Sequence, residues 1–194
     1  MIVLTIDQRG SRAGEDKVQA LLEQLRGVRT VRPFQRTAGD ELQAVLESAP
    51  DAMGIALHLA QSGDWSVGIG VGPVNDPLPK ETRAGSGDAF VYARSAVEAA
   101  KKSPANLCLR ASEHESAGER LDASLQLVSL LERRRSSPSA EAGRLLASGL
   151  TQREIGDSLG ISQQAVSSRL SSGLWNEVER MKAWIVADLQ ELSQ

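Results

Sequence analysis

The stretch WSVGIGVGPV, residues 65–74, gives the clearest indication of the fold. Three glycines alternate with Val67, Ile69 and Val71, so a strand here has one apolar face and one face of nearly bare backbone. Glycine inside a strand marks a close approach by either a helix or a ligand, and we favour a helix. The stretch therefore predicts a sheet with a helix packed tightly on its glycine face.

The segments around this strand alternate between strand-like and helix-like patterns. In chain order the predicted elements are a strand at 2–6, a helix at 16–26, hairpin strands at 34–37 and 42–46, a helix at 50–61, the glycine strand, a helix at 88–102 and a strand at 106–109. This βαββαβαβ order predicts an α+β sandwich in which helices cover a sheet.

Composition gives no global indication of function. A net charge of −3, with 41% hydrophobic and 24% charged residues, is ordinary for a soluble globular chain. The single Cys108 excludes an internal disulfide framework and suits a reducing compartment. No apolar run approaches the roughly 20 residues of a membrane helix, and the MIVLTID start lacks the features of a signal peptide. We therefore expect a cytoplasmic protein with no membrane partner.

The stretch LTQREIGDSLGISQQAVSSRL, residues 150–170, has the spacing of a helix-turn-helix. Thr151 and Glu154 can form a capping box at the start of a first helix. Gly160 suits the chain reversal, and Ser162 can cap a second helix. The motif predicts double-stranded DNA as a partner.

The second predicted helix buries Val166 and Leu170 and leaves a polar face outside. Its amide, hydroxyl and guanidinium groups can contact base edges and phosphates. The candidate DNA-binding residues are Thr151, Gln152, Ser162, Gln163, Gln164, Ser167, Ser168 and Arg169, with Arg133, Arg134 and Arg135 as candidates for phosphate contacts. The alternative is a helical hairpin that makes only protein contacts, which the polar character of the exposed face disfavours.

A long amphipathic helix follows the motif. Its apolar residues recur every three or four positions, at Trp175, Val178, Met181, Ile185, Leu189 and Leu192. This stripe can pack within its own domain, or it can form a dimer seam that holds two recognition helices at a fixed spacing. We expect three parts in the chain: a ligand-sensing domain at 1–112, a connecting helix at 113–136 and a DNA-binding domain at 137–194.

Two acidic residues lie at predicted strand ends. Asp7 ends the first strand, and Asp40 lies in the hairpin turn. If the hairpin lies beside the first strand, the two carboxylates meet and can bind Mg²⁺, which readily shares its shell with phosphate oxygens. The candidate anion contacts are Arg9, Ser11, Arg12, Arg36 and Gly39, together with Gly85, Ser86 and Gly87 at the start of a helix. Asp88 would repel an anion there, and a solvated acidic turn is the alternative to the whole site.

These motifs resemble those of the class III nucleotidyl cyclases and GGDEF cyclases, and more closely those of the SatD family of small, degenerate cyclase-like proteins. The resemblance is carried by Asp7 with Ser11-Arg12, by GDELQ (39–43), by GIGVG (68–72) and by GDAFVYAR (87–94). It includes the helix-turn-helix, which is similar to that of sigma-factor region 4 and related response regulators. It implies a ferredoxin-like or cyclase-like sandwich, a metal and nucleotide pocket with Asp7 and Asp40 as candidate metal ligands, and a homodimer.

The chain departs from the cyclase pattern at one position. In those enzymes an Asn precedes an Arg by four residues, and the two stabilise the transition state. Arg94 is present here and is a further candidate contact of the nucleotide. Phe90 takes the Asn place, and a phenyl ring donates no hydrogen bond to developing charge. Arg36 aligns with the base-reading Lys, which leaves the purine preference open.

We therefore expect a DNA-binding transcriptional regulator whose cyclase-like domain binds a nucleotide or second messenger without catalysis. One alternative is a metal-dependent cyclase or phosphoryl-transfer enzyme that carries a helix-turn-helix targeting domain. A further alternative is a dimerisation scaffold without a ligand.

Overall fold

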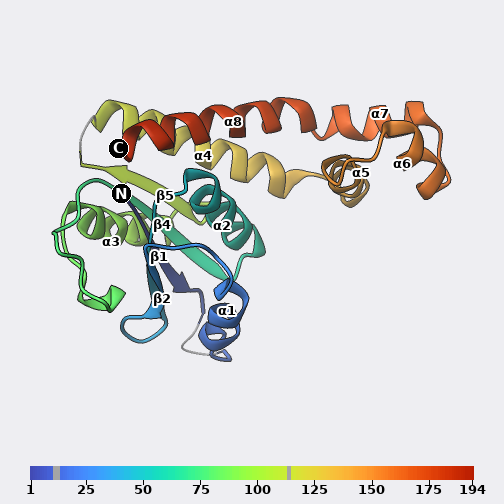
Figure 1. The fold of residues 1–194 in the computed structure, drawn as a ribbon. Helices are drawn as coiled ribbons and strands as arrows, with labels where there is room; N and C mark the ends of the chain where they lie inside the picture. Colours follow the sequence, from blue (N-terminus) through green and yellow to red (C-terminus); the bar gives the residue numbers. More distant parts are fainter. Residues whose placement is uncertain (11–13, 113–114) are drawn as a thin grey trace.

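The computed structural model describes residues 1–10, 14–112 and 115–194. Its centre is a five-stranded mixed sheet with the strand order β2-β3-β1-β4-β5 (Figure 1). The strands are β1 (Ile2–Gln8), β2 (Arg32–Arg36), β3 (Glu41–Leu46), β4 (Trp65–Val71) and β5 (Leu107–Ala111). Neighbouring strands are antiparallel except for the parallel pair β4–β5. The predicted sequence of strands and helices is confirmed as a mixed α/β architecture.

Helices form a layer on each face of this sheet. The helices of the described residues are α1 (Val18–Leu25), α2 (Ala49–Ser62), the short 3₁₀ helix η1 (Thr82–Ala84), α3 (Asp88–Ala100), α4 (Glu115–Arg134), α5 (Ser137–Ala147), α6 (Gln152–Leu159), α7 (Gln163–Ser172) and α8 (Trp175–Leu192), of which α5, α6 and α7 lie away from the sheet. α3 covers one face, whereas α2 and α4 cover the other and α8 packs on both of them (Figure 1). None of the helices in the described ranges has the length and apolar character to cross a membrane.

α3 lies directly on the glycine face of β4. A Cβ atom at Gly68 would lie 2.3 Å from the Val97 nitrogen, and one at Gly70 would lie 2.1 Å from the Ala89 carbonyl oxygen. Neither position can therefore carry a side chain unless the helix moves away. The close approach predicted for this strand is made by a helix, as favoured from the sequence.

The amphipathic helices α4 and α8 belong to the core of the sheet. Leu125 of α4 and Ile185 and Leu189 of α8 are in one buried cluster with β1, β3 and β4. A separate cluster holds α5, α6 and α7 together through Ala142, Ile155, Val166 and Leu170. The helical unit that projects from the sheet thus ends near residue 173. α8, which the sequence pattern places in the DNA-binding domain, runs back along α4, where its apolar stripe is buried with the core of the sheet.

Candidate functional site

A polar strip lies on the α3 face of the sheet. α3 packs on β4, β5 and β1, while η1 lies against β2 and β3. Between them, the amide of Gln43 donates a hydrogen bond to Thr5 Oγ1 at 3.0 Å in a buried position. Asp7 on β1 lies opposite Glu41 on β3 in the strand register. The strip therefore brings acidic and amide side chains from two strands to one place.

A hollow of about 400 Å³ lies at the end of this strip. Asp7, Gln8, Arg9, Gly10, Asp40, Ser66 and Lys101 line it. Asp7 and Asp40 line the same hollow because β3 pairs with β1 and places the hairpin turn beside the end of β1. Arg9 faces it from the segment after β1, where its guanidinium donates to Ser66 Oγ at 3.2 Å and to the Lys101 carbonyl oxygen at 3.4 Å.

Lys101 neutralises the acidic side of this hollow. Its ammonium lies 2.9 Å from Asp7 Oδ2 and 2.7 Å from Glu98 Oε1. Burial raises the pKa of Asp7 above its ordinary value, and the nearby carboxylates of Asp40 and Glu41 add to this effect, although Lys101 opposes it. Burial alone would lower the pKa of Lys101, but its two carboxylate partners outweigh burial and raise it. The hollow therefore holds a paired cation and anion around Asp7.

This arrangement does not fit a resident Mg²⁺. The position beside Asp7 that a cation would take is filled by the Lys101 ammonium. Among the described residues, no three His, Cys, Asp or Glu side chains come together in a group that could hold a metal ion. Asp7 and Asp40 could bind a divalent cation only after Lys101 had moved, so no chemical step here is routed through a metal.

The other predicted anion contacts lie around a second hollow, of about 250 Å³. Gly85, Ser86, Gly87 and Arg94 line it, with Gln43, Arg83, Phe90 and Val91. Arg94 pairs with Glu41 Oε1 at 3.2 Å, and Glu41 directly follows Asp40 of the first hollow. The two hollows are therefore neighbours along β3, at the turn and within the strand.

Several groups around the second hollow already have partners within the protein. The backbone N–H of Ala89, at the start of α3, donates to the Pro73 carbonyl oxygen at 3.1 Å. The side-chain amide of Asn75 donates to Ser86 Oγ at 3.0 Å. Phe90 is only 7% exposed, and a Cβ atom at Gly85 would lie 2.2 Å from its ring. The start of α3 is therefore closed by the loop before it, which reduces the number of free donors for a phosphate.

Two more predicted residues form the hairpin rather than a pocket. Arg36 pairs with Asp16 Oδ2 at 2.8 Å and donates to the Gly39 carbonyl oxygen. This hydrogen-bonded pair lowers the pKa of Asp16. Gly39 has a φ of +58°, as a tight turn requires. Ser11 and Arg12 lie outside the described residues.

Short-range hydrogen bonds define the two helices α6 and α7. The Glu154 N–H donates to Thr151 Oγ1 at 3.3 Å, and the Thr151 N–H donates back to Glu154 Oε2 at 2.8 Å. The hydrogen bonds that the N–H and the hydroxyl of Thr151 donate to the Glu154 carboxylate lower the pKa of Glu154. Gly160 ends α6 with a φ of +65°, and the Ala165 N–H donates to Ser162 Oγ at 3.2 Å. The predicted capping box and caps are confirmed.

α7 presents its polar face to solvent. Gln163, Gln164, Ser167 and Ser168 are exposed, and Arg169 is half-buried at 3.8 Å from Glu141 Oε2. Thr151 and Ser162 are exposed before their helices, with Gln152 partly exposed between them on α6. Val166 and Leu170 are buried on the opposite side. The predicted contact residues of α7 thus lie on the one face of that helix that solvent reaches, apart from the half-buried Arg169.

The three consecutive arginines after residue 132 have different environments. Arg133 and Arg134 are exposed, and Arg133 donates to the Pro104 carbonyl oxygen. Arg135 has a side chain that is only 4% exposed. It donates to the Gly173 carbonyl oxygen at 2.9 Å and lies 4.5 Å from the centre of the Trp175 ring. Its guanidinium is therefore used within the protein and is not free to contact a phosphate.

Sequence reasoning missed an ionic cluster at the base of the projecting unit. Glu132 Oε1 lies 2.6 Å from Lys182 Nζ and 3.2 Å from Arg135 Nη1. The Gln61 amide of α2 donates to the other oxygen of Glu132. From the sequence, only the Glu132–Arg135 pair could have been predicted, because these residues are three positions apart, whereas Lys182 and Gln61 lie far away in sequence. The cluster joins α2, α4 and α8 where the α5–α7 unit begins.

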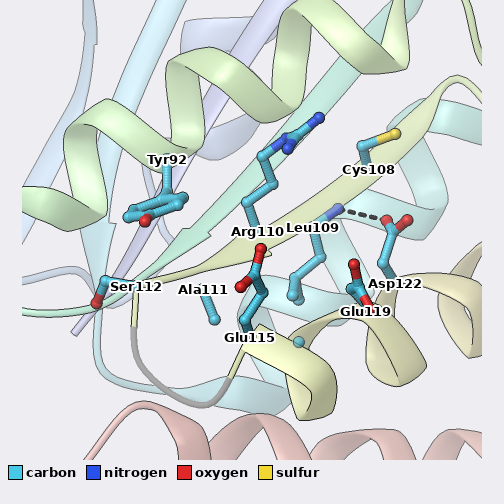
Figure 2. A pocket seen from close by; sticks show the side chains of 10 residues that line it. Tyr92, Cys108, Leu109, Arg110, Ala111, Ser112, Glu115, Glu119 and Asp122 are labelled. Carbon is cyan, nitrogen blue, oxygen red and sulfur yellow. Dashed lines mark hydrogen bonds between the residues drawn. The ribbon is translucent and has the colours of Figure 1, made fainter.

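Sequence reasoning also missed a hollow of about 320 Å³ between the outer edge of β5 and α4 (Figure 2). There the Leu109 N–H donates to Asp122 Oδ1 at 2.6 Å, the bond drawn as a dashed line in Figure 2. Burial raises the pKa of Asp122. Burial, together with the Asp122 charge, raises the pKa of Cys108 to about 11, so this thiol is protonated at neutral pH. Asp122 thus blocks part of a sheet edge that would otherwise be open to another strand.

In comparisons with known proteins, no family model, curated protein or solved structure matches this chain.

Proposed function

We propose that this chain is a DNA-binding transcriptional regulator that reads the major groove with α7 as the recognition helix of a helix-turn-helix. The observation that carries the proposal is the exposure of Gln163, Gln164, Ser167 and Ser168 on one side of a short helix whose other side is buried. Amide groups can pair with adenine, and hydroxyl groups can contact bases or phosphates. Arg169, Arg133 and Arg134 supply positive charge for the DNA backbone.

The sheet is, in this proposal, a ferredoxin-like or cyclase-like domain that binds a nucleotide or second messenger without catalysis. The hollow beside Asp7 supports it, because Arg9 and Lys101 can meet phosphate oxygens while Asp40 remains an acceptor for ribose or base donors. Phe90 supports the absence of catalysis, because its buried ring offers no donor where charge would develop. An anion in this hollow would compete with Asp7 for Lys101.

A chain of contacts leads from this hollow to α4. Lys101 is followed by the segment 103–106, which makes three hydrogen bonds with α4. Ser103 donates to Gln126 at 3.0 Å, Ser129 donates to the Ala105 carbonyl oxygen at 3.3 Å, and Arg133 donates to the Pro104 carbonyl oxygen. We propose that a ligand that displaces Lys101 from Asp7 shifts this segment and, through α4, the orientation of the α5–α7 unit.

Two measurements test the proposal. Binding is measured by fluorescence anisotropy on DNA selected from a random pool, with and without each candidate nucleotide. Gln163→Ala and Gln164→Ala should weaken binding to the selected DNA by about tenfold each while leaving random DNA unaffected, at the lower end of the energy of one base contact. Equal losses on both DNAs would refute the role of α7.

The ligand is sought by a thermal-shift screen with mono-, di- and cyclic nucleotides. A specific ligand should raise the melting temperature of the wild type by mass action, and it should do so less in Arg9→Ala. Formation of a cyclic product from ATP or GTP with Mg²⁺ would overturn the non-catalytic assignment in favour of an enzyme.

A further inference from the structure

One face of α8 carries exposed apolar side chains. Trp184 is 65% exposed and Met181 is 40% exposed, although Ile185 and Leu189, on the side of the helix that packs on α4 and α2, are fully buried. Trp184 and Met181 are three residues apart, which places them on the same side of the helix. Ala187, three residues further on, is also exposed. α8 lies along the outer edge of the molecule, with α4 and α2 on its inner side (Figure 1).

The side chains before and after Trp184 on α8 could complement those of a second, antiparallel copy of the helix. Arg180 lies four positions before Trp184, and Asp188 lies four positions after it. Both are exposed, and neither forms an ion pair with another described residue. Met181 and Ala187 lie at three positions on either side. If a second copy of α8 lies antiparallel across Trp184, each positive end meets a negative end and each small or apolar side chain meets an apolar one.

We propose that this Trp184 stripe, made of Arg180, Met181, Trp184, Ala187 and Asp188, is the seam of a homodimer in which α8 packs antiparallel on α8 of a second copy. A two-fold interface uses the same patch on both subunits, so the patch must complement itself. The stripe does so in charge. Trp is also one of the residue types in which the energetically dominant, central positions of interfaces are enriched.

Charged residues further from Trp184 disfavour two α8 helices whose axes are strictly aligned. Glu177 and Glu191 lie seven positions before and after Trp184 and would face each other as like charges in a strictly parallel alignment of the axes. Packed helices cross at an angle, so side chains diverge with distance from the crossing point. Arg180 and Asp188 of the partner, four positions from the crossing point, would therefore lie closer together than Glu177 and Glu191 of the partner, seven positions from it. The attraction between opposite charges then outweighs the repulsion between like charges.

This seam would also set the distance between two DNA-binding units, a consequence that rests on the proposed function. α8 begins at Trp175, nine residues before Trp184, which is about 14 Å at the helical rise of about 1.5 Å per residue. The two starts of α8 would lie about 27 Å apart, with α7 beyond each of them. That span approaches the separation of about 34–36 Å between successive major grooves on one side of DNA.

The test is the mass of the intact chain in solution, measured by sedimentation equilibrium across micromolar concentrations without DNA. The wild type should have twice the chain mass of 20.7 kDa. Trp184→Glu should raise the dissociation constant of the dimer by about thirtyfold or more, the loss expected at an interface hot spot. Val91→Glu is the matched control, because Val91 is 66% exposed but lies on α3, across the sheet from α8.

A charge exchange tests the antiparallel orientation. Arg180→Glu alone and Asp188→Arg alone should each weaken the dimer, because each then faces a like charge on the partner. The double variant Arg180→Glu with Asp188→Arg restores opposite charges across the two-fold and should return the dimer to near the wild-type strength. Circular dichroism of every variant should match the wild type, since all four substituted positions are exposed.

The proposal would be overturned by a monomeric wild type, or by dissociation constants of the dimer that Trp184→Glu and Val91→Glu change equally. It would also be overturned if the double variant formed a weaker dimer than either single variant. These outcomes do not depend on DNA. If the mass results agree with the seam but no DNA is bound, the proposed function fails and the dimer stands. If DNA is bound by a monomer, the seam fails and the DNA-binding role stands.

Discussion

Replacing Glu132 with Gln should destabilise the protein substantially while preserving the shape of the side chain. The Glu132 carboxylate neutralises Arg135, whose side chain is 4% exposed, and Lys182, whose side chain is 22% exposed. Removing one partner of a buried ion pair costs about 3–5 kcal/mol, because it leaves an uncompensated charge. Lys182 keeps Glu179 at 2.9 Å, and Arg135 keeps its carbonyl and aromatic contacts. We therefore expect a loss near the lower end, about 3 kcal/mol.

Urea unfolding followed by circular dichroism measures this loss. Glu179→Gln is the matched control, because Glu179 also pairs with Lys182 but is 43% exposed. Solvent screening limits such a pair, so this control should cost less than about 1 kcal/mol. If Glu132→Gln costs no more than Glu179→Gln, the reasoning that Glu132 is the buried centre of the cluster is refuted.

Three further predictions concern local features of the fold. Gly68→Ala should lower the free energy of unfolding, measured in urea, by more than about 2 kcal/mol, because its Cβ would overlap the α3 backbone. Gly54→Ala, on an open side of α2, should leave this free energy unchanged or raise it. The Glu154 cap should contribute stability above about pH 4.5 that is lost as pH falls through its lowered pKa; a melting curve unchanged in Glu154→Gln at pH 7 would contradict this. Cys108 should react slowly with a disulfide reagent at pH 8 and faster as pH approaches 11, and rapid labelling at pH 8 would contradict its burial.

The sequence was informative wherever the cause of a structure acts over a short range. The glycine alternation around Ile69 predicted the close packing of α3, because a missing side chain is a local property. The caps at Thr151 and Ser162 and the turn at Gly160 also depend on neighbours within a few residues. The order of strands and helices followed from periodicity, and the predicted ends of nearly all the elements lie within two residues of the observed ends.

The candidate site could be predicted only in part. Pairing of β3 with β1 brings Asp7 and Asp40 to one hollow, and the hairpin pattern made that pairing an expectation. Lys101 could not be anticipated, because its approach to Asp7 depends on the length and placement of α3 across the sheet. The same applies to the closure of the start of α3 by Pro73.

Read alone, the sequence determined the local conformations: the alternating strand, the capped helices and the polar face of α7. The tertiary structure decided which charged groups are free. Arg134 and Arg135 are adjacent in sequence, yet one is exposed and the other is buried against Trp175, because consecutive residues at a helix end point in different directions and only one meets the returning chain. From the sequence, the apolar stripe of α8 could pack within its own domain or form a dimer seam. The structure packs its buried face on α4 and α2 instead, because the tertiary fold brings their apolar side chains beside it and their mutual burial stabilises the fold.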